Sequence, residues 1–311
     1  MEITASMVKE LREKTGAGMM DCKKALQETS GDMEKAIDVL REKGLSKAAK
    51  KADRIAAEGL IGVEVSADYK KAALVEINSE TDFVAKNEEF QQLVKDVTNL
   101  VLEKAPETLE ELFALQLNGQ TVQEELTAKI SKIGENMNIR RFERLEVENG
   151  RLISYVHGAG KIVSVVKLET SSQDAKVEEL GKDVAMQVAA MNPKYISEKY
   201  VDQEYLNHER EVLKQQAINE NNELPEGKRK PEEIVLKMLE GRLKKELKEV
   251  CLLDQAFVKE AKKSVGEVVA ETAKAVGADI TVAQIVRFEV GEGIEKKQEN
   301  FAEEVAKQMG N

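Results

Sequence analysis

The 311-residue chain has no Trp, and aromatic residues make up only 4% of it. Its cores must therefore be built mainly from Val, Ile, Leu, Ala and Met. Cys22 and Cys251 are far apart and lack metal-ligand spacing, which favours free, buried thiols in a reducing compartment. A signal-peptide pattern is absent, and no apolar run approaches the roughly 20 residues of a membrane span. We expect a cytoplasmic protein that does not contact a membrane.

Positive charge is in deficit, since 47 Lys and Arg face 58 Asp and Glu, for a net charge of −11. Such a chain repels a phosphate backbone at long range, which argues against direct nucleic-acid binding and favours a protein partner. The exception is the run from Arg41 to Arg54, with six basic residues and two acidic ones. No aromatic is interleaved there to stack on bases, so the run indicates a solvated helical linker rather than an RNA site.

Catalytic machinery is also missing from the sequence. The only histidines are His157 and His208, and neither has a nucleophile or acid at motif spacing. Gly160-Lys161 is not a phosphate loop, because Tyr155 and Ile162 stand where that motif needs a glycine and a hydroxyl. This segment is predicted to be a hairpin turn, with His157 exposed at its edge. We expect no enzyme activity, no cofactor and no metal site.

What is present begins with three short helices in residues 1–54. The apolar spacing predicts a helix over 6–14, a second starting near Met19, and a third that Asp32 caps and Gly44 ends. Neighbouring side chains on a helix point about 100° apart, so Met19 and Met20 cannot both face a small core. One of them should be exposed and form a contact patch with Arg12 and Lys23; the alternative is that both methionines seal the bundle against the next domain.

Two segments about 90 residues apart then repeat one plan of strand, turn, strand and helix. The strands are 60–65 and 72–77 in the first copy, and 152–156 and 162–168 in the second. Strands at 139–147 and 280–290, which share similar tetrapeptides (140–143 and 286–289), are each expected to close one antiparallel sheet. The fold class is therefore predicted to be α+β, with two duplicated subdomains.

A helical hairpin is predicted in residues 198–248, with a seam formed by two apolar stripes. The residues of these stripes are Val201, Tyr205, His208 and Val212, then Ile234, Met238, Leu239, Leu243 and Leu247. Phe301, Val305 and Met309 predict a short C-terminal helix. The expected domains are 1–54, 55–139, 140–197 with 249–290, the hairpin 198–248, and 291–311.

The junction after the second strand differs between the copies. The first copy has Asn-Ser-Glu-Thr-Asp-Phe at 78–83, and the second has Glu-Thr-Ser-Ser-Gln-Asp at 169–174, without an aromatic. Ser79 and Asp82 fit the spacing of a capping box, so Asp82 could serve as a cap, and Phe83 could fill a core or project outward. Because the second copy manages without them, the comparison favours an outward role for Asp82 and Phe83 and leaves Ser79 as the better cap.

Residues 76–87 and 11–26 resemble the two signatures of the elongation factor Ts family, whose members are nucleotide exchange factors for elongation factor Tu. The resemblance implies a ubiquitin-associated-like N-terminal module, a hairpin that serves for homodimerisation, and a C-terminal module that also touches the partner. It further implies contacts with elongation factor Tu, and the residues at 81–84 would disturb the Mg²⁺ site of that partner. The implied contact residues form three groups: Thr81, Asp82, Phe83 and Val84; Arg12, Met19, Met20 and Lys23, which would contact the GTPase domain of the partner; and His157.

Overall fold

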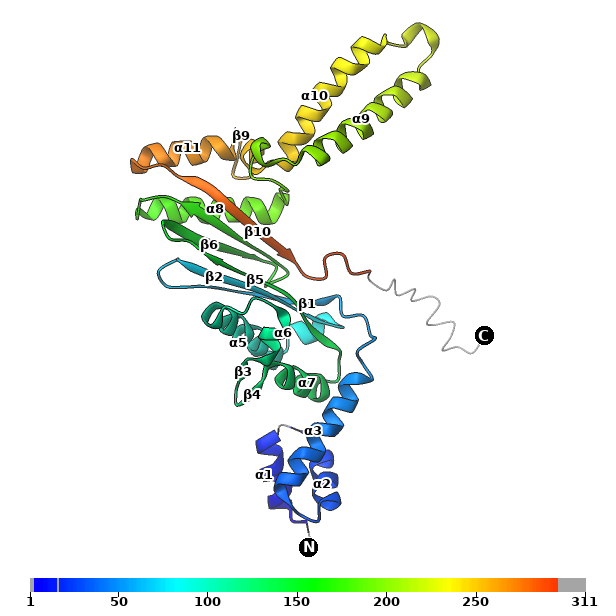
Figure 1. Cartoon of the computed structure of the whole chain (residues 1–311), viewed down its shortest axis with the longest axis vertical. Helices are drawn as coiled ribbons and strands as arrows, with labels where there is room; N and C mark the ends of the chain where they lie inside the picture. The colour runs from blue at the N-terminus through cyan, green and yellow to red at the C-terminus, as the bar shows by residue number, and fades with distance from the viewer. Residues whose placement is uncertain (1–2, 16, 296–311) are drawn as a thin grey trace.

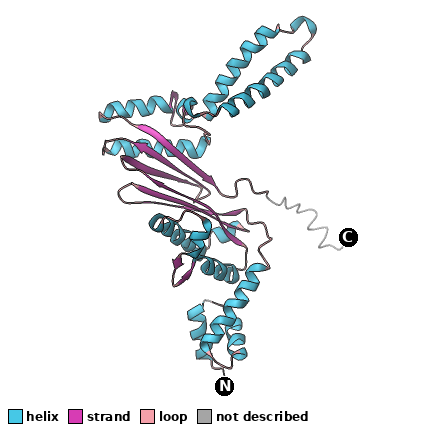
Figure 2. Ribbon diagram, in the orientation of Figure 1, coloured by secondary structure: helices cyan, strands magenta, loops and turns pink. Residues whose placement is uncertain are grey.

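The computed structural model describes residues 3–15 and 17–295 of the chain. Its centre is a stack of helices, sheet, sheet and helices, with a three-helix module at one end and a helical hairpin at the other (Figure 1, Figure 2). Both central sheets are antiparallel and three-stranded, in the orders β1-β2-β5 and β10-β7-β6. The predicted α+β class is confirmed.

The N-terminal module consists of α1 (Ala5–Thr15), α2 (Met19–Glu28) and α3 (Met33–Ala49). Leu11, Cys22 and Leu26 are fully buried in its small core. Asp32 caps α3 as predicted, because its carboxylate accepts a hydrogen bond from the backbone N–H of Lys35 at 3.1 Å.

The prediction that Gly44 ends the third helix is wrong, since α3 continues to Ala49. Gly44 faces helix α7 (Val122–Ile133), where a Cβ at this position would lie 3.8 Å from the Ser131 side chain. Arg41 forms an ion pair with Glu124 of the same helix. A glycine inside a helix costs about 1 kcal/mol relative to Ala, and packing against α7 offsets that cost.

The first sheet-and-helix unit follows α3. Its sheet contains β1 (Glu58–Val65), β2 (Lys71–Ser79) and β5 (Met137–Glu146). Its helices are α4 (Asp82–Ala85), α5 (Glu88–Lys104), α6 (Leu109–Ala114) and α7 (Val122–Ile133), with a small ribbon of β3 (Gln116–Leu117) and β4 (Gln120–Thr121). The expected boundary between residues 139 and 140 falls inside β5, whose pairing with β2 extends from Met137 to Glu146.

The second unit repeats this plan. Its sheet contains β6 (Gly150–His157), β7 (Ile162–Glu169) and β10 (Thr281–Glu289), covered by α8 (Ala175–Met191) and α11 (Val265–Val276). A 3₁₀ turn η3 (Leu252–Asp254) and the ribbon of β8 (Ala256–Phe257) and β9 (Glu260–Ser264) complete it. The hairpin turn predicted at 157–161 is confirmed, because β6 before it pairs with β7 after it, from Gly150 with Glu169 to His157 with Ile162.

The two sheets pack face to face through a shared apolar cluster, in which Ile61, Leu74 and Leu145 come from the first sheet and Leu152, Val163 and Phe288 from the second. The similar tetrapeptides do close the two sheets, but they are not equivalent in space. Phe142 lies opposite Val75 and packs toward the helices, whereas Phe288 lies opposite Val163 and packs between the sheets. Adjacent strand residues face opposite sides, so a small difference in register reverses the face.

The hairpin consists of α9 (Gln203–Glu223) and α10 (Glu232–Val250), with 3₁₀ turns η1 (Glu198–Tyr200) and η2 (Glu226–Lys228). Leu239, Leu243 and Leu247 are buried as predicted, and Val201 and Tyr205 of the other predicted stripe pack in the same cluster. The continuation of that stripe along α9 is wrong by one position. His208 and Val212 are exposed, and Leu213 and Ala217 are buried instead. The predicted stripe begins at Val201, which precedes the first residue of α9 and does not share its helical phase. Ile234 and Met238 are also partly exposed. The expected C-terminal helix lies outside the described residues.

Candidate partner-binding site

The loop of residues 80–87 joins β2 to α5 and contains the one-turn helix α4. Val84 and Ala85 are 6% and 4% exposed, so one side of this turn packs against the core. Phe83 lies on the other side and is 78% exposed. Phe83 therefore does not fill a core, and Val84 holds the turn in place rather than facing solvent.

Glu135 fixes the start of this loop. Its carboxylate accepts hydrogen bonds from the Thr81 backbone N–H at 3.0 Å and from the Thr81 hydroxyl at 2.7 Å. The next residue, Asn136, donates its backbone N–H to Glu80. Nothing in the sequence pattern indicates Glu135, because it lies 54 positions from Thr81. Hydrogen bonds at Glu80 and Thr81 thus hold the loop just before Phe83.

The capping role expected for Ser79 is wrong. Ser79 is fully buried at the end of β2, and its hydroxyl donates to the Thr81 carbonyl oxygen at 3.0 Å. Helix α5 is capped instead by Asn87, whose side-chain oxygen accepts from the backbone N–H groups of Glu89 and Phe90 at 2.8 and 3.2 Å. Neither Ser79 nor Asp82 is needed to start the long helix.

Asp82 and Phe83 share a neighbour in Lys86. The Lys86 ammonium lies 2.8 Å from an Asp82 carboxylate oxygen and 5.6 Å from the centroid of the Phe83 ring. Its hydrogen bond to Asp82 holds the pKa of that carboxyl below its usual range, and its charge and that of Lys161 act in the same direction. Asp82 is therefore a carboxylate at neutral pH, beside an exposed aromatic ring.

The turn between β6 and β7 brings the second unit to the same region. Lys161 on this turn pairs with Glu58 of β1 at 2.8 Å, and the Gly160 carbonyl accepts from the Ile61 backbone N–H at 2.9 Å. His157 is exposed at the edge of this turn, as predicted, and its ring stacks on Tyr155 with 6.3 Å between centroids. The proximity of Lys161 to the loop was not predicted from the sequence.

The candidate residues of the N-terminal module are all exposed. Met19 and Met20 are 56% and 64% exposed at the start of α2, and Arg12 and Lys23 are exposed too. Two methionines that are more than half exposed do not seal the bundle, so that alternative is excluded. Because this module and the loop of residues 80–87 lie at separate places along the molecule, they form two surfaces rather than one (Figure 1).

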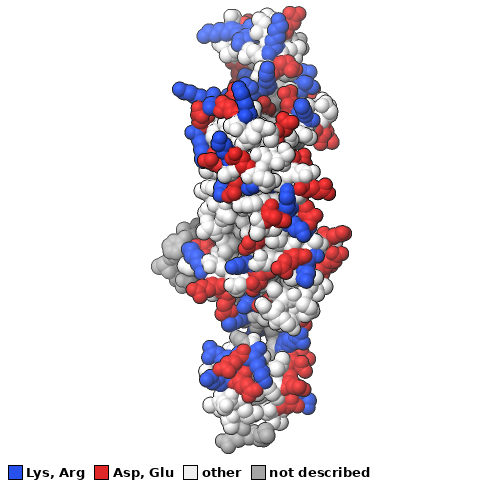
Figure 3. All heavy atoms as spheres, turned by 90° about the vertical axis from the view of Figure 1, so that its left-hand side faces the viewer, with Lys and Arg blue, Asp and Glu red and all other residues white. Residues whose placement is uncertain are grey.

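The basic run 41–54 is largely neutralised by ion pairs. Lys43 pairs with Glu28, Lys47 with Asp21, and Arg54 with Glu80, in addition to the pair of Arg41 with Glu124. On the face seen in Figure 3, acidic and basic side chains alternate along the length of the molecule. This pattern is typical of a solvated surface rather than a phosphate-binding one.

Potential metal ligands and reactive thiols can be followed through residues 3–15 and 17–295. Within these ranges no cluster of three or more His, Cys, Asp or Glu could hold a metal ion. Burial raises the pKa of the Cys22 thiol and raises that of Cys251 to about 11, so neither is an activated nucleophile. The same ranges hold no helix with the length and apolarity needed to cross a bilayer.

The fold and the site together define an α+β protein whose candidate residues, apart from the buried Val84 and the half-buried Thr81, are exposed on its surface. The profile of the family described as Elongation factor TS matches residues 80–292. Proteins called Elongation factor Ts from Clostridioides difficile (strain 630) and Clostridium perfringens (strain 13 / Type A) are 60% and 57% identical to the chain, and each alignment covers 99% of both sequences. The chain belongs to the elongation factor Ts family, as its two sequence signatures predicted, and this family places it in translation elongation.

Proposed function

We propose that the chain is the nucleotide exchange factor for elongation factor Tu and acts without chemistry of its own. It binds elongation factor Tu in its GDP-bound form, disturbs the Mg²⁺ and phosphate site, and promotes GDP release so that GTP can bind. The observation that carries this proposal is Phe83, a 78% exposed aromatic on a loop that is braced by Glu135 and by the buried Val84.

The physical basis is thermodynamic linkage. A factor that binds the nucleotide-free partner more tightly than the GDP-bound partner must weaken GDP binding by the same factor. Phe83 is the anchor in this proposal, since buried aromatics dominate interface hot spots. Asp82 enters beside it as a carboxylate, because Lys86 keeps its pKa low. The two side chains thus bring an apolar wedge and a negative charge to one point on the partner.

The other surfaces have supporting roles in this proposal. Met19 and Met20, with Arg12 and Lys23, grip the GTPase domain, since exposed methionines adapt readily to a partner surface. His157 is a third contact, beside the turn that reaches the loop through Lys161. The exposed Val212, Ile234 and Met238 give the hairpin an apolar surface for a second copy of the chain. These contacts form in the cytoplasm.

The test is the release of labelled GDP from elongation factor Tu, followed with increasing amounts of this protein. We expect micromolar protein to accelerate release by at least an order of magnitude, in line with coupling free energies of a few kcal/mol. A matched variant, Phe83→Ala, keeps the fold and separates the wedge from the rest of the surface. No acceleration by the folded wild-type protein contradicts the proposal.

A further inference from the structure

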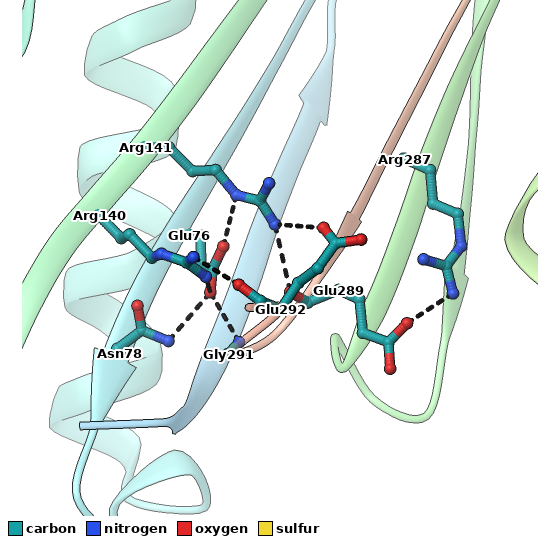
Figure 4. Close-up of polar contacts among 8 residues, drawn as sticks. All are labelled: Glu76, Asn78, Arg140, Arg141, Arg287, Glu289, Gly291 and Glu292. Carbon is teal, nitrogen blue, oxygen red and sulfur yellow. Dashed lines mark hydrogen bonds and ion pairs between the residues drawn. The ribbon is translucent and has the colours of Figure 1, made fainter. Parts of the chain in front are cut away.

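Glu76 is a fully buried carboxylate in β2. Its Oε1 accepts hydrogen bonds from the Gly291 backbone N–H at 2.8 Å, the Asn78 amide at 3.0 Å and Arg140 at 3.2 Å. Its Oε2 accepts from Arg141 at 2.6 Å (Figure 4). Burial alone would raise the pKa of Glu76, but the hydrogen bonds from Gly291, Asn78 and Arg141 outweigh it and hold the pKa below its usual range.

A β-bulge allows two consecutive arginines to reach this carboxylate. Arg141 lies opposite Glu76 and Ile139 lies opposite Ile77, so Arg140 is the extra residue of β5. Neighbouring residues of a regular strand point to opposite faces, and a bulge redirects one of them. Both side chains therefore reach the same point of the sheet, as Figure 4 shows.

The two arginines also hold the chain where it leaves the second sheet. Arg140 donates to the Glu292 carbonyl oxygen, and Arg141 donates to the Glu289 carbonyl at 3.2 Å and to the Glu292 carboxylate at 3.1 Å. Gly291 has φ of +72°, and a Cβ there would lie 2.2 Å from the Ala57 carbonyl oxygen. The turn at 289–292 is thus fixed against the first unit by a centre 215 positions away.

The same centre reaches toward the loop of residues 80–87. Asn78 is two residues after Glu76 on β2, and its amide donates both to Glu76 and to the Glu58 carbonyl oxygen at 3.1 Å. Strand β2 ends one residue later, at Ser79, where the loop begins. The buried carboxylate therefore links the strand that presents Phe83 to the exit of the C-terminal segment.

We propose that Glu76 is a positioning residue that sets the course of the chain beyond Gly291 relative to the loop of residues 80–87. The proposal rests on the function proposed above, in which that loop binds elongation factor Tu, and on the expectation from the family resemblance that the C-terminal module touches the same partner. Stability alone does not require a buried charge, because well-packed apolar residues usually serve as well as a buried ion pair. Holding two contact regions in their bound arrangement strengthens binding by lowering its entropic cost.

The test combines a distance with an exchange measurement in the full chain. Spin labels at Gln92→Cys and Glu295→Cys, both exposed positions, report the separation of α5 from the C-terminal exit, and the native cysteines are buried. We expect Glu76→Gln to broaden this distance distribution about twofold or more, because the buried centre loses its charge. Arg287→Gln is the matched control, since Arg287 pairs with Glu289 on the second sheet (Figure 4).

In the exchange assay we expect Glu76→Gln to raise the half-saturating concentration about fivefold while the rate at saturation changes less than about twofold, as lost preorganisation predicts. Arg140→Gln, which leaves Arg141 in place, should raise the half-saturating concentration by a smaller factor. It replaces Glu76→Gln in both measurements if that variant does not fold. An unchanged distance distribution overturns the positioning role. A broadened distribution with unchanged exchange overturns its link to binding. If the wild-type protein does not accelerate GDP release from elongation factor Tu, the proposed function fails. The distance measurement still tests the positioning role in that case.

Discussion

The two sheet-and-helix units share one plan but join the second strand to the long helix differently. The first unit places seven residues, 80–86, between Ser79 and the cap Asn87, whereas the second places four, 170–173, between Glu169 and the cap Asp174. Both caps accept hydrogen bonds from the first turn of their helix. The comparison teaches that the cap belongs to the common scaffold, while Asp82 and Phe83 lie in residues that the second unit does without.

A second difference concerns the face that each sheet turns to the other. Glu76 lies opposite Ile61, and Lys167 lies opposite Leu152, and both partners belong to the cluster between the sheets. Equivalent places thus hold a fully buried Glu in the first unit and a half-buried Lys in the second. The first unit has taken on a polar centre as well as a longer loop.

The largest effect is expected from Glu76→Gln on stability. Leaving two arginines without their buried partner should lower the free energy of unfolding by about 3 kcal/mol at pH 7. Because the folded-state pKa of Glu76 is lowered, the stabilisation is present above its unfolded value of about 4.3 and is lost as the pH falls through the folded value. Denaturant unfolding at pH 7 and at lower pH checks this.

Lys167→Met is the matching change in the second unit and should cost less than about 0.5 kcal/mol. If the free energies of unfolding of wild type and Glu76→Gln differ by the same amount down to acid pH, the carboxylate charge is not responsible for the lost stability.

The next effect is expected from Phe83→Ala on exchange. Removing an interface anchor should slow GDP release from elongation factor Tu about tenfold or more. Because Phe83 is mostly exposed, the thermal midpoint should hardly move. Phe90→Ala, at a fully buried position of α5, is the control and should cost about 3 to 5 kcal/mol of stability. Equal exchange by Phe83→Ala and wild type would remove the wedge from the mechanism.

The sequence predicts the fold class and the exposed Phe83 because strands, helices and the internal repeat each produce a local sequence pattern. The exposed Phe83 followed from comparing the two copies, and the buried Leu239, Leu243 and Leu247 followed from helical spacing. Contacts between distant segments leave no such pattern. Glu135 reaches Thr81 across 54 positions, and the opposite faces of Phe142 and Phe288 depend on a strand register that the similar tetrapeptides do not record.

A smaller effect is expected from Glu135→Gln. The amide keeps one acceptor but loses the charge that binds both the N–H and the hydroxyl of Thr81, so the loop should become less ordered. We expect the half-saturating concentration in the exchange assay to rise about threefold. Glu111→Gln is the matched control, because Glu111 likewise accepts a backbone N–H, that of Glu107, but on α6. Equal behaviour of the two variants would deny the brace a role in exchange.

The smallest effect is expected from Lys86→Met, which removes the cation that contacts both Asp82 and Phe83. The second unit has no counterpart of this residue, since its shorter connection leads directly to Asp174. An exposed ion pair contributes little and is screened by salt, so we expect the half-saturating concentration to rise about twofold at low ionic strength. The difference from wild type should disappear at high ionic strength. Lys95→Met, on the exposed side of α5, should show neither change. A difference that persists in high salt would mean that a salt-screened charge interaction of Lys86 does not account for its effect on exchange.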